Sequence, residues 1–156
     1  MRELAWHTAY ATLPFLRFDA FDDTDRACDR FLAGHVANRA SRAQGRALVL
    51  AAEAMDIRIQ LPIGHWPVAL GAVLAGRASL DQAREVAMFG ALRSAMSAAV
   101  RLGVVGPLRA QKMLLDVEPV AREALAEVVE TPRSIAPLVE LAQGAHDRLY
   151  ARLFQS

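Results

Sequence analysis

The sequence has little of the residues on which several classes of protein depend. Its single cysteine, Cys28, excludes an internal disulfide framework and a cysteine-rich zinc site. The formal net charge is only +1 at pH 7, which gives no bulk electrostatic reason to expect nucleic acid or an anionic membrane as a partner. Aromatic residues make up 6% of the chain, whereas 31 residues are alanine. Because alanine favours helices and disfavours strands, an all-β fold is nearly excluded.

Long hydrophobic runs are also missing. The longest uncharged stretch, Ile59–Gly76, is interrupted by Pro62 and Pro67 and would make a poor membrane span. The first residues include an acid, Glu3, and no long apolar run precedes Arg17, so they do not resemble a signal peptide. A lone thiol fits a reducing compartment. We therefore expect a cytoplasmic protein with no membrane partner.

The sequence does contain a series of helical segments separated by glycine and proline. Residues of the AVILMFWYC set make up 54% of the chain and charged residues 22%, which excludes a disordered chain. The expected helices span about residues 4–18 with a break at Pro14, 22–32, 38–55, 67–75, 80–102, 107–115, 119–129 and 138–153. A length of 156 residues suits one domain. The sequence thus predicts an all-α fold that forms a single domain over residues 1–156.

The helix expected over residues 80–102 is the centre of the predicted bundle. Ser79 and Gln82 have the spacing of a capping box, which marks its start. From Val86 to Val100 the only charged residue is Arg93. A helix that is apolar on all sides is either central in a bundle or covered by another subunit. We therefore predict a helical bundle around this helix, with self-association through any part of it that is left uncovered.

No arrangement of residues in the sequence predicts catalysis or metal binding. None of the four histidines lies three or four residues from another. The sequence has no nucleophile elbow, no phosphate-binding loop and no dinucleotide-binding fingerprint. Cys28 lies beside Asp25 and Asp29, and because acids raise the pKa of a thiol, a nucleophilic role is disfavoured. We expect no catalytic residues, no metal ligands and no enzyme activity; an enzyme with a site built from dispersed histidines is a weaker alternative.

Three arginines, Arg39, Arg42 and Arg46, are placed on one helix face by their i, i+3, i+7 spacing. One interpretation is a basic stripe that docks nucleic acid or an acidic partner, and a helical nucleic-acid-binding or regulatory module is therefore the alternative function. The other interpretation is a solvated face. We favour the solvated face, because no aromatic residues are interleaved with the arginines.

The last seven residues, Tyr150–Ser156, combine two aromatic rings with an arginine and a leucine. Chain ends fray unless other contacts hold them. Aromatic and arginine side chains also carry much of the binding energy of protein interfaces. Two interpretations are open: the segment binds a partner, or it is a final helical turn that folds back onto its own core.

Four blocks of the sequence resemble, in order, the UreF family of urease accessory proteins. The end of the chain, His146–Ser156, resembles the family's C-terminal signature, which commonly contains Tyr-x-Arg-Leu-Phe-x-Ser. Three internal blocks are similar to the family's Arg/Ser/Gly helix, its His-x-Pro-Val…Gly block and its Ala-Ala-x-Arg-Leu…Gly…Gln segment: Arg39–Arg46, Gly64–Gly71 and Ser97–Gln111. Together the four blocks cover the chain from Arg39 to its end, which makes the resemblance fairly specific.

The chain departs from the family pattern at several positions. Trp66 stands where the family usually has Tyr or Phe, and Asp147 replaces the usual Glu. Pro107 occupies a position where the family often has Gln. The segment rich in serine, proline, glycine and histidine that precedes the family's first long helices is missing before Trp6. We therefore expect the chain to correspond to the family's C-terminal two thirds, either as a truncated chain or as a short member.

The resemblance implies an all-helical, usually dimeric chaperone that is not an enzyme. Such a protein bridges the accessory protein UreD, also called UreH, and the GTPase UreG while nickel is inserted into apo-urease. No cofactor is expected on the chain itself, because nickel and GTP are handled by the partners. The family's tail contributes to the UreD/UreH contact. The resemblance carries partner binding over to the tail of about residues 146–156 and to two internal motif residues: Tyr150, Arg152, Leu153, Phe154 and Ser156, with Arg101 and Gln111.

Overall fold

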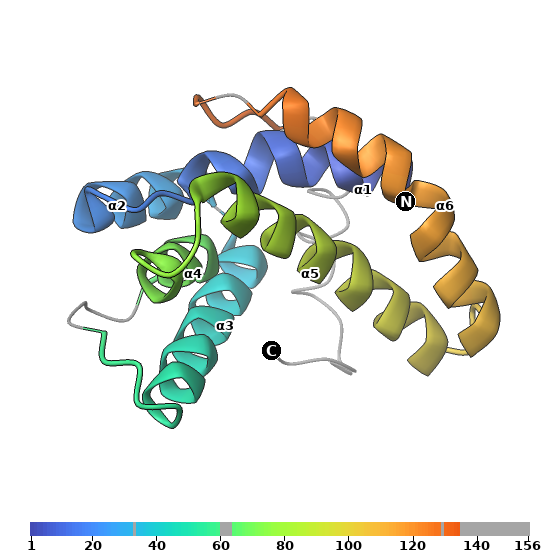
Figure 1. Ribbon diagram of the computed structural model, residues 1–156, viewed down its shortest axis with the longest axis horizontal. Helices are drawn as coiled ribbons and strands as arrows, with labels where there is room; N and C mark the ends of the chain where they lie inside the picture. Colours follow the sequence, from blue (N-terminus) through green and yellow to red (C-terminus); the bar gives the residue numbers. More distant parts are fainter. Residues whose placement is uncertain (33, 60–63, 129, 135–156) are drawn as a thin grey trace. The chain divides into compact units, whose positions relative to one another are not determined.

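The computed structural model describes residues 1–32, 34–59, 64–128 and 130–134 (Figure 1). Every regular element in these ranges is helical and none is a strand, so the predicted all-α class is confirmed. The elements are α1 (Arg2–His7), the π-helix η1 (Thr8–Thr12), the 3₁₀-helix η2 (Leu13–Phe15), α2 (Phe21–Phe31), α3 (His35–Glu53), α4 (Trp66–Leu74), α5 (Leu80–Arg101) and α6 (Pro107–Ala126). The helix predicted over residues 138–153 lies outside the described residues.

The chain forms two compact units. Of the described residues, those within 1–14 and 84–134 form the first unit, and those within 15–83 form the second. Helix α5 begins in the second unit and continues into the first. The expectation that the whole chain is a single domain built around this helix stays a prediction.

Helices α3 and α4 pack closely together in the second unit. Gly45 allows the close approach, because a Cβ atom at this position would collide with the backbone carbonyl oxygen of Gly64. Helix α4 buries most of its residues: Pro67, Val68, Ala69, Leu70, Gly71 and Val73. Since burial of apolar surface stabilises a fold by roughly 25 cal/mol per Å², α4 supplies much of the core of this unit.

Helix α1 packs against α6 in the first unit. Ala5 and Ala9 are fully buried on the α1–η1 segment, and Ala124 is fully buried on α6. Such small side chains shorten the distance at which two helices can pack. Beyond the end of α6, the backbone N–H of Arg133 donates a hydrogen bond of 2.8 Å to the carbonyl oxygen of Tyr10. The beginning and the end of this unit are therefore held together by both packing and backbone contact.

The start of α5 is the capping box that the sequence predicts. The backbone N–H of Gln82 donates to Oγ of Ser79 over 3.2 Å, and the backbone N–H of Ser79 donates to Oε1 of Gln82 over 2.8 Å. Two otherwise unsatisfied donors are thereby bonded. At the start of α2, Ala20 occupies the N-cap position, and no side chain there makes a capping hydrogen bond. Asp22 and Asp23 lie in the first turn instead, where a negative charge favours the positive end of the helix dipole.

Helix α6 is continuous where the sequence predicts two helices. We expected a helix to end near Leu115 and another to begin at Pro119, but α6 contains Pro119 in its interior. An internal proline removes a backbone hydrogen bond and usually bends the helix, and α6 bends along its length in Figure 1. Exposed ion pairs with i, i+4 spacing support the helix around the proline: Lys112–Asp116 at 2.7 Å and Glu118–Arg122 at 2.9 Å.

Helix α5 buries one face and not its whole circumference. Ala87, Met88 and Leu92 are buried, whereas Val86 is 53% exposed and Phe89 is 59% exposed. Within the described residues, the expectation of a helix covered on all sides therefore holds for only part of α5. Among the described residues, no helix, α5 included, is both long enough and apolar enough to cross a membrane.

Candidate functional site

A polar cluster joins α2, α3 and the start of α4 in the second unit. Asp29 on α2 accepts hydrogen bonds from Nδ2 of Asn38 over 2.8 Å and from Nη2 of Arg42 over 2.7 Å, and both donors lie on α3. Nε2 of His65, the residue before α4, lies 3.3 Å from the same carboxylate. The backbone N–H of His65 also donates to Oδ1 of Asp25 over 2.7 Å. These contacts tie the three helices together.

The cluster sets the protonation of two of its side chains. Hydrogen bonds from Asn38, and after it from Arg42, hold the pKa of the Asp29 carboxyl well below its usual range. Burial raises the pKa of the Cys28 thiol to about 12, and the neighbouring Asp25 carboxylate acts in the same direction. A thiol with this pKa stays protonated at neutral pH, which agrees with the prediction that Cys28 is not a nucleophile. Burial is a larger cause of the raised pKa of Cys28 than the acidic neighbours from which the sequence predicted it.

The three arginines of α3 do not present one free basic face. Arg42 is bonded to Asp29 and lies 3.6 Å from Oδ2 of Asp25, so its charge is balanced within the chain. Arg39 and Arg46 are exposed at the surface. Because binding of a phosphate backbone depends on the number of charges that face it, the geometry gives little support to the alternative function in nucleic-acid binding.

The histidines of the described ranges belong to no metal-binding cluster. In these ranges, no group of three or more His, Cys, Asp or Glu side chains could hold a metal ion. His65 is fully buried, and its Nδ1 atom has no hydrogen-bond partner among the described residues. His146 lies outside the described residues. His65 is thus a packed residue that fixes the start of α4 through its contacts with Asp25 and Asp29.

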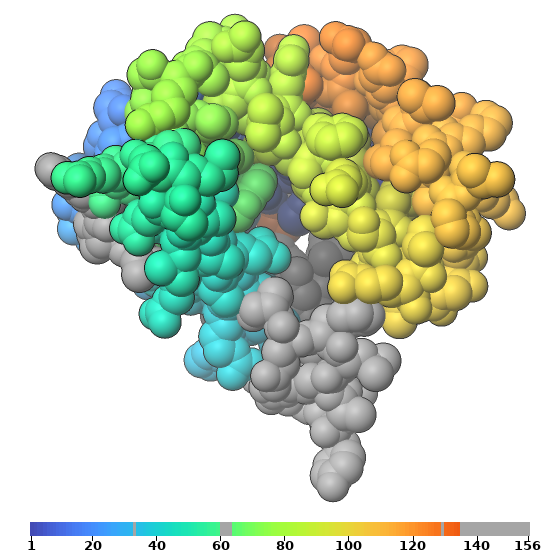
Figure 2. All heavy atoms as spheres, turned by 60° about the horizontal axis from the view of Figure 1, so that its bottom comes forward, coloured from blue at the N-terminus to red at the C-terminus, as the bar shows by residue number. Residues whose placement is uncertain are grey.

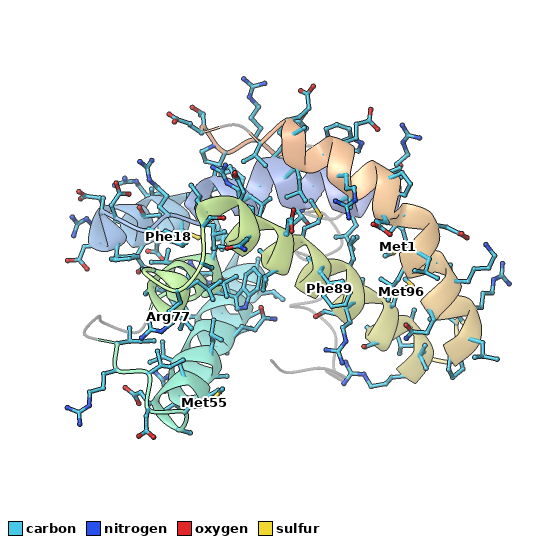
Figure 3. All side chains as sticks on the ribbon, in the orientation of Figure 1. Met1, Phe18, Met55, Arg77, Phe89 and Met96 are labelled. Carbon is cyan, nitrogen blue, oxygen red and sulfur yellow. The ribbon has the colours of Figure 1, made fainter. Side chains whose placement is uncertain are left out.

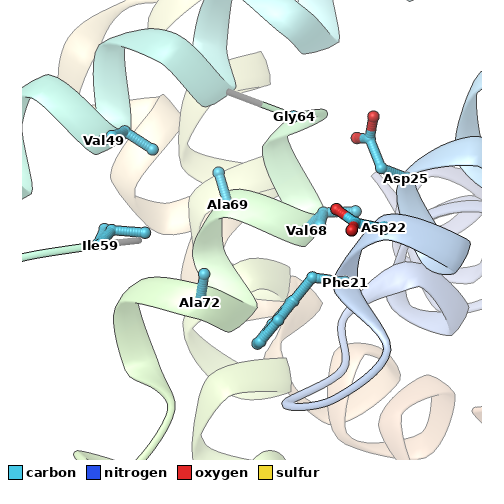
Figure 4. Close-up of a pocket in the computed structure, with 9 residues that line it drawn as sticks. All are labelled: Phe21, Asp22, Asp25, Val49, Ile59, Gly64, Val68, Ala69 and Ala72. Carbon is cyan, nitrogen blue, oxygen red and sulfur yellow. The ribbon is translucent and has the colours of Figure 1, made fainter. Parts of the chain in front are cut away.

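A small hollow lies beside the polar cluster in the second unit (Figure 4). Its walls come from α2, α3, α4 and the segments next to them: Phe21, Asp22, Asp25, Val49, Ile59, Gly64, Val68, Ala69 and Ala72. Its volume is about 20 Å³, which is room for about one water molecule. The hollow is therefore too small for a cofactor or a substrate.

A larger hollow, the α5–α6 groove, lies in the first unit. Its volume is about 420 Å³, which is in the size range of sites that bind other molecules. Met88 and Leu92 form a floor that is almost fully buried, and Phe89 and Leu115 are exposed at its sides. Phe89 lies midway along α5 (Figure 3), and the side chains of α5 and α6 lie side by side in yellow-green to orange in Figure 2. Polar residues also line the groove: Glu85, Arg93, Gln111, Glu118 and Arg122.

Helix α5 ends in a Schellman motif. The backbone N–H of Val104 donates to the carbonyl oxygen of Ala99 over 2.9 Å, and that of Gly103 donates to Val100 over 3.0 Å. Gly103 has φ +69°, a left-handed conformation that glycine adopts without strain. Gly103 therefore fixes the direction in which the chain leaves α5. The residue after it in this motif usually packs back onto the helix, but Val104 is 77% exposed.

Apolar side chains gather in the sequence around this turn. Leu102 is 52%, Val104 is 77% and Leu108 is 88% exposed, and these three residues are termed the α5–α6 tip. Arg101, the last residue of α5, is exposed next to them in the chain. Exposed apolar residues accompanied by arginine are typical of protein interfaces.

The structure describes two of the predicted partner-binding residues. Arg101 ends α5, and Gln111 lies on α6 and lines the α5–α6 groove. The predicted tail residues lie outside the described residues, so their role stays a prediction: Tyr150, Arg152, Leu153, Phe154 and Ser156.

The sequence reasoning missed Leu108 and Leu115. They are seven residues apart on α6 and share a helix face, and both are exposed. This seven-residue spacing could have indicated from the sequence that the two leucines share a helix face. Apolar spacing alone, however, does not distinguish an exposed helix face from a buried one.

Comparisons with known proteins point to one family. The family model named UreF matches residues 4–118. The chain is similar to the urease accessory protein UreF of Trichodesmium erythraeum, with 32% identity over 150 residues that cover 83% of this chain and 64% of the relative. It is also similar to urease accessory protein F of Oryza sativa subsp. japonica, with 27% identity over 150 residues that cover 83% of this chain and 57% of the relative. The chain thus spans 57% to 64% of the length of these two relatives. No solved structure matches it.

Proposed function

Because the chain belongs to the UreF family of urease accessory proteins, we propose that it is a non-enzymatic chaperone of urease maturation. It bridges UreD, also called UreH, and the GTPase UreG while nickel is inserted into apo-urease. No cofactor binds directly to it, since nickel and GTP are held by the partners. A dimeric state and a cytoplasmic location, where GTP is available, are part of the same proposal.

The observation that carries the proposal is the α5–α6 tip. Its three apolar side chains are more than half exposed, and removing such surface from water contributes roughly 25 cal/mol per Å² to binding before other costs. The tip lies within Ser97–Gln111, the segment that resembles the internal motif of the family. A scaffold requires a surface of this kind. Arg101 and Gln111 extend it with side chains that donate hydrogen bonds.

The C-terminal residues form the second part of the proposed partner surface. Leu153 and Phe154 fill apolar pockets of UreD/UreH, and Arg152 makes charge-assisted hydrogen bonds there. Tyr150 and Ser156 complete the contact. The support for this part is the resemblance of the tail to the family signature together with its aromatic and arginine content.

Co-purification of the full chain with UreD/UreH tests both parts separately. Deleting residues 150–156 should abolish co-elution. Val104→Ser combined with Leu108→Ser should weaken binding at least about tenfold, because both apolar side chains lose their contact with the partner. Unchanged binding after the deletion contradicts the tail contact, and unchanged binding of the double variant contradicts the tip contact.

A matched control comes from the second unit. Met55 is 73% exposed and lies outside the tip and the tail, so Met55→Ser should leave binding to UreD/UreH unchanged. If this variant weakens binding as much as the tip variant does, the effect reflects general loss of apolar surface and the assignment of the tip is wrong.

A further inference from the structure

Basic residues are concentrated in the part of the sequence that contains the α5–α6 tip. Between Glu85 and Asp116 the sequence has no acidic residue. The basic residues of the same stretch are Arg93, Arg101, Arg109 and Lys112. Because the whole chain has a net charge of only +1, the rest of the chain carries more acids than bases. The small net charge therefore results from a separation of charge, with a basic stretch around the exposed apolar residues of the tip.

Two of these arginines flank the tip. Arg101 is the last residue of α5 and Arg109 lies in the first turn of α6, so the three tip residues stand between them in the chain, around the turn that joins the two helices (Figure 1). Both arginines are exposed. Among the described residues Arg109 forms no ion pair, whereas Lys112 is bonded to Asp116 over 2.7 Å. Arg109 therefore adds a positive charge to the edge of an apolar surface.

The stability of α6 does not explain the sign of this charge. The N-terminus of a helix carries a partial positive charge, which favours acids in the first turn and disfavours bases. The first turn of α6 contains Arg109 and no acid, and the acids of this helix all lie from Asp116 onward. Residues that oppose a local rule of this kind are expected at functional sites. We therefore attribute the charge of Arg109 to binding and not to folding.

We propose that the α5–α6 tip binds an acidic protein surface in which carboxylates surround an apolar hollow. The three tip residues fill the hollow, and Arg109 at its edge donates charge-assisted hydrogen bonds to the carboxylates. The charges speed association, and the apolar contact slows dissociation. The inference rests on the proposed function, in which the tip contacts UreD/UreH, and it adds the charge of the surface that the tip meets.

A protein surface fits the tip better than an anionic membrane does. Attraction to anionic lipids usually needs a cluster of about four to eight basic residues. The tip has only Arg101 and Arg109 beside it, and the charge of Lys112 is balanced by Asp116. A single guanidinium, by contrast, can donate two parallel hydrogen bonds to one carboxylate.

Binding rates of the full chain to purified UreD/UreH test the charge. They are measured by surface plasmon resonance at about 50 mM and about 300 mM salt, because salt screens exposed charges. Arg109→Glu should lower the association rate constant at least about fivefold at the lower salt and change the dissociation rate constant by less than about threefold. The difference in association rate should shrink at the higher salt. Arg109→Lys keeps the charge and should associate within about threefold of the original rate.

Arg58→Glu is the matched control. Arg58 is exposed and lies in the second unit, and its reversal changes the net charge by the same amount, so both rate constants should stay unchanged. Urea unfolding checks the fold. Because glutamate suits the first turn of a helix better than arginine does, Arg109→Glu should not lower the urea midpoint. A lowered midpoint together with slower association would give Arg109 a structural role and overturn the proposal.

The outcomes separate this inference from the proposed function. If the original chain binds UreD/UreH but Arg109→Glu associates at the original rate, or Arg58→Glu slows as much, the acidic surface is overturned and the chaperone proposal stands. If the original chain does not bind UreD/UreH, the proposed function is contradicted, and the inference that rests on it fails too. Binding of the chain to phosphatidylserine vesicles that Arg109→Glu abolishes would assign the tip to a membrane and overturn the protein partner.

Discussion

Arg42 donates a hydrogen bond of 2.7 Å from Nη2 to Oδ1 of Asp29 and so connects α3 to α2 across 13 positions of sequence. The same carboxylate oxygen accepts a hydrogen bond from Asn38. A carboxylate that receives several hydrogen bonds is favoured in its charged form. The hydrogen bonds therefore lower the pKa of Asp29 in the folded chain, and this leads to a prediction about how stability depends on pH.

Asp29→Asn should flatten the dependence of stability on pH at the acidic end. The pKa of Asp29 is lowered in the folded chain, first by Asn38 and then by Arg42. Stability from this shift is fully present above the unfolded pKa of about 3.9 and is lost as the pH falls through the lower folded pKa. The original chain should thus lose melting temperature between about pH 5 and pH 3 more steeply than the variant. Circular dichroism melts at a series of pH values give the two slopes.

Asp116→Asn is the control for this measurement. Asp116 is an exposed acid on α6 whose contact is an i, i+4 pair with Lys112, and such pairs contribute little to stability. Its variant should keep the slope of the original chain. Equal slopes for all three proteins would show that Asp29 does not control the acid sensitivity.

Gly45→Ala should destabilise the second unit by about 1–3 kcal/mol, the usual range for overpacking a tight site. The added methyl group would collide with the backbone carbonyl oxygen of Gly64, and a backbone atom cannot turn aside as the end of a side chain can. Gly90 on α5 is the matched control, since it is also a helical glycine but has open space around its Cβ position. Gly90→Ala should be neutral or stabilising by up to about 1 kcal/mol. Urea unfolding followed by circular dichroism, at one protein concentration, compares the two; equal effects would contradict the close packing at Gly45.

The closeness of α3 and α4 also shows what the sequence could and could not predict. Two of the blocks that carry the family resemblance, Arg39–Arg46 and Gly64–Gly71, meet in the structure. Gly45 lies against Gly64, and Oγ of Ser41 accepts a hydrogen bond of 3.2 Å from the backbone N–H of Trp66. The residue types in these blocks could be read from the sequence, but their contact depends on how two helices pack. No local pattern encodes that distance.

Local signals predicted the helix ends well, and they failed where tertiary packing overrides them. The capping box at Ser79 depends on residues three apart, and Gly103 ends α5 through its own backbone conformation. Pro119 is the opposite case, because its local signal ends a helix, yet α6 continues through it. Val117 and Ala121, on the two sides of the proline, are both buried on α6, and this packing favours a continuous helix despite the lost hydrogen bond. The exposure of Phe89 likewise depends on which neighbours cover α5, which composition cannot show.

Ser79→Ala should destabilise the protein by about 0.5–2 kcal/mol. The hydroxyl of Ser79 accepts the hydrogen bond of the Gln82 backbone N–H, and alanine leaves that donor without its cap. Ser94 provides the control, because it is an exposed serine in the interior of the same helix, and Ser94→Ala should be neutral or slightly stabilising, given the higher helix propensity of alanine. A double-mutant cycle with Gln82→Ala, read from urea midpoints, measures the coupling within the box; additive effects of the two substitutions would contradict it.

Cys28 should resist thiol reagents in the folded protein. Its side chain is 1% exposed, and burial raises the pKa of its thiol to about 12. The reactive thiolate is therefore scarce at pH 8, and the reagent must also wait for local opening of α2. Reaction with a chromogenic disulfide reagent at this pH should be at least about a hundredfold slower in the folded chain than in denaturant. Because the chain has a single cysteine, the signal reports on this position alone and the unfolded chain is its own control. Equal rates in both states would mean that the fold does not shield the thiol. The conclusion that Cys28 is buried between α2 and its neighbours would then be wrong.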